Sequence, residues 1–402
     1  ELIATITTDE TGIAKLSGLP LGKYYVKEKE TAEGYVLDGE IREIDLTYVD
    51  QETAEVTWNG DWQNNRQKAK VSVLKKEKDT DRVLEGAVFA LSAKEDITNK
   101  DGDVVLEAGT VIEEKATGED GKLTFEADLP IGFSYVVKET SPAPGFATTD
   151  EVQEFTFTAE SSDKATVSYE FIFEDEPTVF EFTKTSLTDG KEVEGAKLTV
   201  TDENGEVVDE WVSGKEPHII KELVVGQTYT MTEVLPAPGY VTAESIQFTV
   251  EDTAEVQKIE MKDDVTKVEI SKTDIAGKEL PGAKLTILDE NGEVVESWTS
   301  TEEPHYIEML PIGRYILHEE SAPEGYLVAE DIEFEVKDTG EIQKVVMKDE
   351  AAPEETPEEP QNPVGTDAPK TGDDTNLLFW TALLGIGLCG TGAAFVMRRK
   401  RR

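Results

Sequence analysis

Three lysines recur at one position of a repeated pattern, two residues after a pair of apolar residues that alternate with polar ones. They are Lys75 after Val71 and Val73, Lys184 after Phe180 and Phe182, and Lys272 after Val268 and Ile270. Because successive side chains of a strand point to opposite faces, each lysine shares the face of its apolar neighbours. We therefore expect the three amines to point into hydrophobic cores. Lys76 offers a competing register in the first case, and the alternation favours Lys75.

Carboxyl and amide side chains recur in phase with these lysines. An acid or amide follows alternating apolar residues late in each unit, and a glutamate stands seven residues before the aromatic residue of a Gly-aromatic turn. The late residues are Asn64, Asp175, Asp263 and Asp349, and the glutamates are Glu28, Glu139, Glu233 and Glu319. Buried charges are costly unless they are paired. We expect the lysine, the aspartate and the glutamate of one unit to meet.

Burial would also change the reactivity of these groups. It lowers the pKa of a lysine and raises that of a carboxyl, which favours a neutral amine beside a protonated acid. A neutral amine is a nucleophile, and a protonated carboxyl can lose water to it. The sequence leaves two alternatives open, a buried Lys–Asp–Glu salt-bridge cluster and a covalent amide.

The elements that must position these residues are short strands in tandem domains. One phrase occurs four times, for example as LPIGFSYVVKETSPAPGF from Leu129 and LPIGRYILHEESAPEGY from Leu310. Self-similarity at a domain-sized period indicates tandem domains. Alternating apolar residues and hairpin signals such as Asn204-Gly205 predict an all-β chain of tandem, Ig-like sandwiches.

The repeats predict the domain boundaries. We expect domain 1 to be the C-terminal part of a sandwich whose first strand is absent, followed by three complete domains and a Pro/Glu-rich linker. The ranges are 1–66 for domain 1, 67–177 for domain 2, 178–265 for domain 3, 266–350 for domain 4 and 351–367 for the linker. Domain 2 carries an insertion at roughly 96–118. Without a lysine partner for Glu28 and Asn64, domain 1 should be less ordered and should be the first region that proteases remove.

The recurring phrases resemble the B-type repeat of the collagen adhesin and the SpaA-type pilin domain, which share a prealbumin-like sandwich. The resemblance covers essentially all of residues 1–350 and implies an intramolecular isopeptide bond. A first-strand lysine attacks a last-strand Asp or Asn, and a middle-strand glutamate transfers protons. Carried onto this sequence, the bonds are Lys75–Asp175, Lys184–Asp263 and Lys272–Asp349, with Glu139, Glu233 and Glu319 as proton carriers and Glu28 and Asn64 as an incomplete set. With aspartate, water leaves instead of ammonia.

The C-terminal 35 residues point to the cell envelope. The run 377–397 is uncharged and long enough for a transmembrane helix, and the basic tail 398–402 would stay in the cytoplasm. With the preceding Ala368-Pro369-Lys370-Thr371-Gly372, the segment 368–402 resembles the sorting signal of sortase-anchored Gram-positive proteins, whose motif is Leu-Pro-any-Thr-Gly. That resemblance implies cleavage between Thr371 and Gly372. An ordinary tail anchor is the alternative.

Composition narrows the function further. A net charge of −47 excludes nucleic acid as a partner, and the only cysteine, Cys389, lies in the expected transmembrane helix. No metal, cofactor or enzyme motif is present, so we expect no enzyme beyond a single autocatalytic turnover. The sequence predicts an extracellular, wall-anchored stalk that displays an N-terminal region, with sortase and peptidoglycan as partners. The alternatives are a pilin joined to other subunits, an adhesin that binds a host surface ligand, and the spacer of a wall-anchored enzyme.

Overall fold

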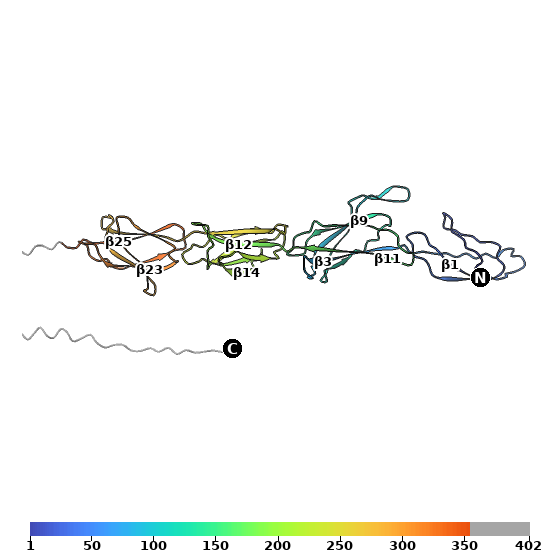
Figure 1. Cartoon of the computed structure of the whole chain (residues 1–402), viewed down its shortest axis with the longest axis horizontal. Coiled ribbons are helices and arrows are strands. Elements are labelled where there is room, and N and C mark those ends of the chain that lie inside the picture. The colour runs from blue at the N-terminus through green and yellow to red at the C-terminus, as the bar shows by residue number, and fades with distance from the viewer. Residues whose placement is uncertain (354–402) are drawn as a thin grey trace, which may run out of the picture. The chain divides into compact units, whose positions relative to one another are not determined.

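The computed structural model describes residues 1–353, and this part of the chain contains strands and no helix (Figure 1). The predicted all-β fold is confirmed. The expected transmembrane segment 377–397 and the sortase motif 368–372 lie outside the described residues. No helix within residues 1–353 is long and apolar enough to cross a membrane.

Domains 2, 3 and 4 each consist of a three-stranded and a four-stranded sheet. In domain 3, β12 (Val179–Ser186) lies between β15 (His218–Lys221) and β18 (Val256–Asp263), and the second sheet has the order β14-β13-β16-β17. Its strands are β13 (Lys197–Thr201), β14 (Val207–Val212), β16 (Thr228–Leu235) and β17 (Ile246–Thr249). Domain 4 repeats this plan with the orders β22-β19-β25 and β21-β20-β23-β24. Its strands are β19 (Lys267–Asp274), β20 (Lys284–Asp289), β21 (Val294–Thr299), β22 (His305–Glu308), β23 (Gly313–Ser321), β24 (Ile332–Val336) and β25 (Ile342–Asp349).

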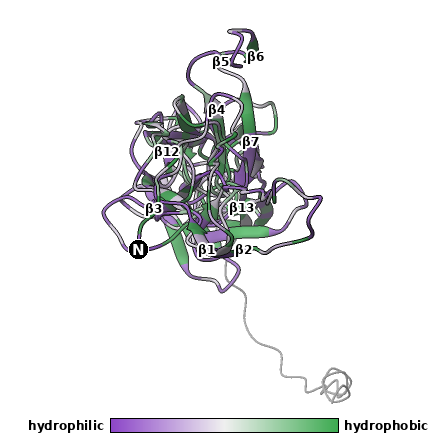
Figure 2. Ribbon diagram, turned by 90° about the vertical axis from the view of Figure 1, so that its right-hand side faces the viewer, coloured by the Kyte–Doolittle hydropathy of each residue, from purple (hydrophilic) through white to green (hydrophobic). Residues whose placement is uncertain are grey.

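Domain 2 has the same plan with one extra hairpin. Its sheets have the orders β11-β3-β8 and β10-β9-β4-β7. Their strands are β3 (Lys68–Glu77), β4 (Val88–Ala93), β7 (Val111–Ala116), β8 (Lys122–Thr124), β9 (Ser134–Ser141), β10 (Val152–Thr156) and β11 (Thr166–Asp175). The hairpin of β5 (Ile97–Thr98) and β6 (Val104–Leu106) projects from the sandwich (Figure 2). The predicted insertion at 96–118 was too long, because β7 pairs with β4 as a strand of the main sheet.

The first and last strands of each complete domain pair in parallel. They are β3 with β11, β12 with β18 and β19 with β25. The chain therefore enters a sandwich at one end and leaves it at the other, along two adjacent strands. A parallel pair requires a crossover, and here that crossover is the rest of the domain.

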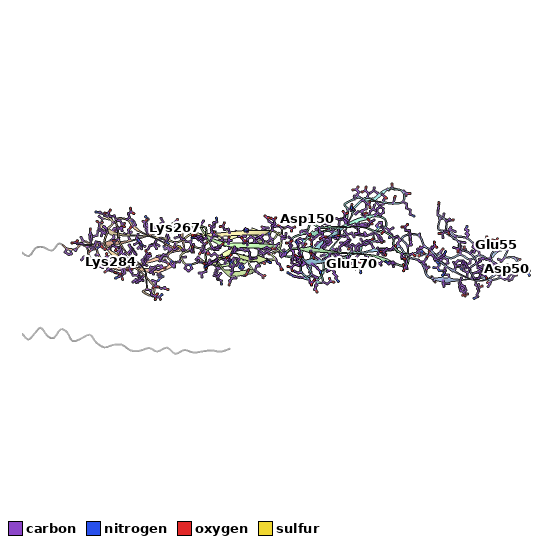
Figure 3. All side chains as sticks on the ribbon, in the orientation of Figure 1. Asp50, Glu55, Asp150, Glu170, Lys267 and Lys284 are labelled. Carbon is purple, nitrogen blue, oxygen red and sulfur yellow. The ribbon has the colours of Figure 1, made fainter. Side chains whose placement is uncertain are left out.

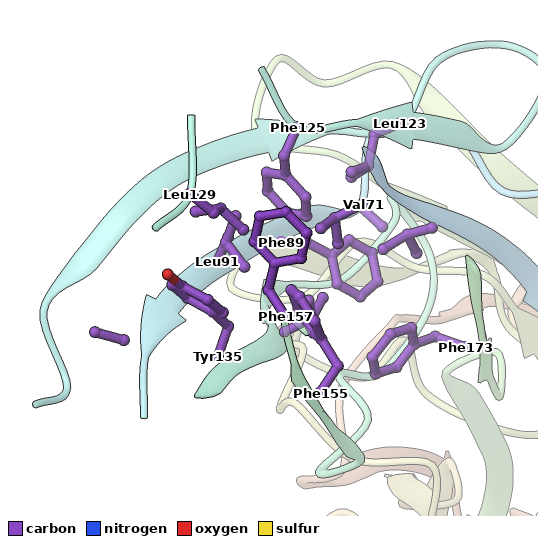
Figure 4. Close-up of a cluster of buried hydrophobic side chains, with 14 of the residues drawn as sticks. Val71, Phe89, Leu91, Leu123, Phe125, Leu129, Tyr135, Phe155, Phe157 and Phe173 are labelled. Carbon is purple, nitrogen blue, oxygen red and sulfur yellow. The ribbon is translucent and has the colours of Figure 1, made fainter. Parts of the chain in front are cut away.

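Each complete domain has its own hydrophobic core, built from the inward-facing side chains of both sheets. Figure 4 shows Phe89, Phe157 and Phe173 converging in domain 2, where the rings of Phe89 and Phe173 lie 4.8 Å apart. Charged side chains such as Asp150, Glu170 and Lys284 are exposed (Figure 3). Inward apolar and outward charged residues alternate, as expected for a sandwich in water.

Domain 1 is described as one antiparallel pair, β1 (Gly22–Lys27) with β2 (Ile41–Leu46). Apolar residues ahead of this pair are exposed, including Leu2 and Ile3. The expected sensitivity of domain 1 to proteases stays a prediction.

Candidate functional site

A lysine and two carboxyls meet in the core of domain 3. Lys184 comes from β12, Asp263 from the adjacent β18 and Glu233 from β16 in the facing sheet. The Lys184 Nζ donates a hydrogen bond to Asp263 Oδ1 and lies 3.1 Å from Glu233 Oε1. All three side chains are at most 1% exposed. The group is a buried ion cluster that joins both sheets.

The same cluster occurs in domains 2 and 4. Lys75 Nζ lies 3.0 Å from Glu139 Oε1, and Lys272 Nζ lies 2.9 Å from Glu319 Oε1. Each amine also donates to an aspartate, Asp175 in domain 2 and Asp349 in domain 4. The neighbouring Lys76 points instead toward the exposed Asp81, at 3.5 Å. The structure thus brings together all nine side chains that the sequence assigned to the three complete domains.

Strand register explains how each lysine reaches its aspartate. In domain 3 the parallel ladder places Lys184 opposite Met261, and Asp263 is the next residue of β18 that faces the core. Asp263 lies two residues beyond Met261 along β18, and the long, flexible lysine side chain spans this offset. The equivalent partners are Phe173 for Lys75 and Met347 for Lys272, so the geometry is conserved among the three repeats.

A β-bulge accompanies each glutamate, and the sequence analysis missed it. The register between β13 and β16 shifts beside Leu198, whose partner is Glu233. Equivalent shifts lie beside the partners of Glu139 and Glu319. Bulges re-aim side chains next to functional sites. No Gly or Pro marks these positions on the glutamate strands, which leaves no local sequence signal.

A backbone N–H fixes the second oxygen of each glutamate. Oε2 accepts from an N–H ten residues further along the chain, at 2.6–2.9 Å. The pairs are Glu139 with Thr149, Glu233 with Ala243 and Glu319 with Ala329. This bond leaves Oε1 facing the lysine.

Domain 1 contains the corresponding pair without an amine. Asn64 Nδ2 donates to Glu28 Oε1 at 2.7 Å, and the N–H of Asp38 donates to Glu28 Oε2 at 2.7 Å. No lysine within residues 1–353 hydrogen-bonds to Asn64 or Glu28. Glu28 and Asn64, the incomplete set of the sequence analysis, therefore lie together in domain 1.

A family model for the SpaA prealbumin-like fold domain matches residues 1–62, 69–170, 178–265 and 266–351. The chain belongs to the SpaA family. No curated protein sequence matches it significantly.

Among solved structures, the TIE protein of Bacillus anthracis is 26% identical, with a TM-score of 0.37, over 71% of this chain and 51% of that one. This SpaA chain thus spans about half the length of that relative. The major pilin SpaD of Corynebacterium diphtheriae is 15% identical, with a TM-score of 0.35, over 70% and 97% of the two chains. A streptococcal ancillary pilin is 15% identical, with a TM-score of 0.29, over 71% and 100%.

Burial raises the pKa of the three cluster aspartates of these SpaA domains and of Glu139. In domain 3 burial, together with the nearby Glu233, raises the pKa of Asp263 to about 7 against the opposing effect of Lys184. In domain 2 burial raises the pKa of Glu139 to about 7, and it also raises that of Asp175. In domain 2 the two carboxyls interact, so their titration belongs to the pair.

Two carboxyl oxygens in each cluster are buried without a hydrogen bond, the glutamate Oε1 that faces the lysine and the aspartate Oδ2. The Oδ2 atoms of Asp175, Asp263 and Asp349 are buried without a hydrogen bond. A buried unsatisfied oxygen costs about 1–3 kcal/mol and requires an explanation. Loss of Oδ2 as water would remove that cost.

Amide formation in the SpaA domain 2 is expected to slow roughly tenfold per pH unit above about 7, where the pKa of Glu139 lies. In the resting cluster the lysine is charged and one carboxyl is protonated. In the reactive cluster the amine is neutral and both carboxyls are protonated. The two states therefore hold the same number of protons. Above the raised pKa the cluster loses one of these protons. The unbonded domain should also lose stability as the pH rises from the ordinary pKa of 4.5 to about 7, because the folded state holds the extra proton only in this interval, and no further loss is expected above it.

The measurement is the mass of the chain against time after refolding, at a series of pH values, from material kept denatured since synthesis. A rate that climbs with pH across the whole series would contradict this account, because it would mean that loss of a lysine proton to solvent controls the reaction.

Proposed function

We propose that this chain is a surface stalk whose SpaA domains seal themselves with Lys–Asp isopeptide bonds. The observation that carries the proposal is the buried amine that donates to an aspartate in all three complete domains, beside a glutamate at 2.9–3.1 Å. A structural salt bridge needs one carboxyl, whereas here a second carboxyl, that of the glutamate, lies against the same amine.

The reaction balances within each cluster. In domain 3, Glu233 takes a proton from Lys184, and the neutral Nζ attacks Cγ of the protonated Asp263. A C–N bond forms as Glu233 gives its proton to the departing oxygen and takes the second proton from Nζ. The C–O bond breaks, water leaves, and Glu233 ends protonated. The neutral amide replaces a buried ion pair and removes the unsatisfied Oδ2. The glutamate acts once, so the cross-linking is a single autocatalytic turnover.

The position of the bond supports a mechanical function. It joins the first strand to the last strand, which are the two strands through which the chain enters and leaves each sandwich. Tension along the chain would pass from lysine to aspartate without loading the sheets between them.

The intact mass of the chain tests the proposal. We expect the mass to be lower than the sequence mass by three waters, one for each Lys–Asp pair. Glu233→Ala should restore one water, since it disables domain 3 alone. The sequence mass in fully folded protein would refute the proposal, and loss of all three deficits in the variant would refute independent domains.

We also propose that the chain is anchored outside the cell through Ala368-Pro369-Lys370-Thr371-Gly372. A sortase would cut after Thr371 and join it to peptidoglycan or to another pilin subunit. The order of motif, apolar run and basic tail in the sequence supports this proposal. The linker 351–367 would span the wall.

Thr371→Ala is expected to move the protein from the cell-wall fraction to the membrane fraction, because the carbonyl at which a sortase acts would no longer be recognised. Fractionation after muralytic digestion measures the distribution, and Thr375→Ala is the matched control outside the motif. Extraction of the full-length wild-type chain by detergent alone would show an ordinary membrane anchor.

A further inference from the structure

The contacts between successive domains lie close to the glutamates of the clusters. Gly145 of domain 2 packs closely on Glu222 of domain 3. A Cβ added to this glycine would lie 2.8 Å from the backbone oxygen of Glu222. Gly239 of domain 3 meets Met309 of domain 4 in the same way. Successive domains are therefore in tight contact at the Gly-aromatic turn that follows each glutamate strand.

The turn leads into a loop that an aspartate of the next domain holds. Asp252 of domain 3 accepts the N–H of Thr148 at 2.8 Å through Oδ1 and its hydroxyl at 2.7 Å through Oδ2. Asp338 of domain 4 likewise accepts the N–H of Thr242 at 2.8 Å. In domain 1 the equivalent N–H, that of Leu37, donates to the Ser162 oxygen of domain 2 at 2.8 Å.

The very next N–H in each loop holds the glutamate. Thr149 donates to Glu139, and Ala243 donates to Glu233. Two adjacent residues thus make the two contacts: the first bonds to the following domain, and the second bonds to the glutamate that carries protons. The charge of Asp252 also reaches the cluster, since it adds to burial in raising the pKa of Asp175.

We propose that Asp252 and Asp338 are positioning residues for isopeptide formation in the domain that precedes each of them. They fix the loop whose N–H orients the glutamate, so a domain seals fastest once its C-terminal neighbour has folded. The inference rests on the proposed cross-linking. Domain 4 is a natural internal standard, because Val328 at the equivalent position makes no such bond within residues 1–353.

The test measures, in the full chain refolded from denaturant, the rate at which each of the three cross-linked peptides appears. Asp252→Ala should slow the Lys75–Asp175 bond about five- to tenfold, as expected for losing hydrogen bonds worth about 1 kcal/mol. The bonds in domains 3 and 4 should form at the wild-type rate. Asp338→Ala should slow the bond of domain 3 and leave that of domain 2 unchanged.

Asp252→Asn separates positioning from general destabilisation. Its amide oxygen still accepts a hydrogen bond from Thr148, so most of the rate should return. An unchanged rate in Asp252→Ala, or equal slowing in all three domains, would overturn the inference while leaving the cross-links intact. Absence of every cross-link in the wild-type chain would instead refute the proposed function, and the positioning role with it.

Discussion

Glu233→Ala should lower the melting temperature of domain 3 by about 20–35 °C. Without the glutamate, the Lys184–Asp263 bond does not form, and these residues lie 79 positions apart. Closing a loop of this length removes unfolded-state entropy worth about 4.5 kcal/mol, as for a disulfide. A domain of this size melts about 4–8 °C lower for each kcal/mol lost.

Calorimetry of the full chain measures the effect, because the unmodified domains supply reference transitions in the same scan. The matched control is Glu244→Ala, which removes an exposed glutamate one residue beyond Ala243. It should leave every transition in place. If Glu233→Ala still showed the mass deficit of one water in domain 3 but melted early, the loss of stability would come from packing and not from a missing bond.

Under force, the wild-type domain 4 should not unfold, and Glu319→Ala should make it extensible. With the bond formed, the load passes from Lys272 to Asp349, which lie 77 positions apart, and the chain between them is shielded. Without it, the parallel pair β19–β25 must carry the load, and its rupture would release about 260 Å of chain.

Single-molecule pulling on the full chain tests this expectation. The variant should show one new step of that length, while domains 2 and 3 stay closed. Glu320→Ala, at the more exposed neighbouring position on β23, should add no step. Three unfolding steps in the wild-type chain would contradict the shielding.

The sequence was informative where side-chain alternation decides the outcome. Lys184 and Asp263 could be assigned to the core because both continue an apolar period-two pattern, and burying their charges makes sense only if they meet. The choice of Lys75 over Lys76 followed from the same rule. The repeats made the domain architecture visible, since each phrase recurs with the spacing of one domain.

The features that the sequence concealed depend on partners distant in the chain. The bulges opposite the glutamates and the parallel pairing of first and last strands are properties of the assembled sheets. The strand β7 was mistaken for part of an insertion, because the extra hairpin moved it away from its expected place. Asp252 looked like one exposed acid among many in a chain of net charge −47. Only the contact with Thr148 distinguishes it.

The placement of each lysine and aspartate at the two margins of a domain has a consequence for damage by proteases. Once the amide has formed, a cut at any loop between Lys184 and Asp263 leaves two fragments that are still covalently joined. The chain on either side of the nicked domain stays connected, and nothing is shed from the surface. To sever the chain, a protease would have to cut outside the segments that the Lys–Asp bonds enclose, in the few residues between the aspartate of one domain and the lysine of the next. In the joint between domains 3 and 4 those residues include Thr266, which is fully buried.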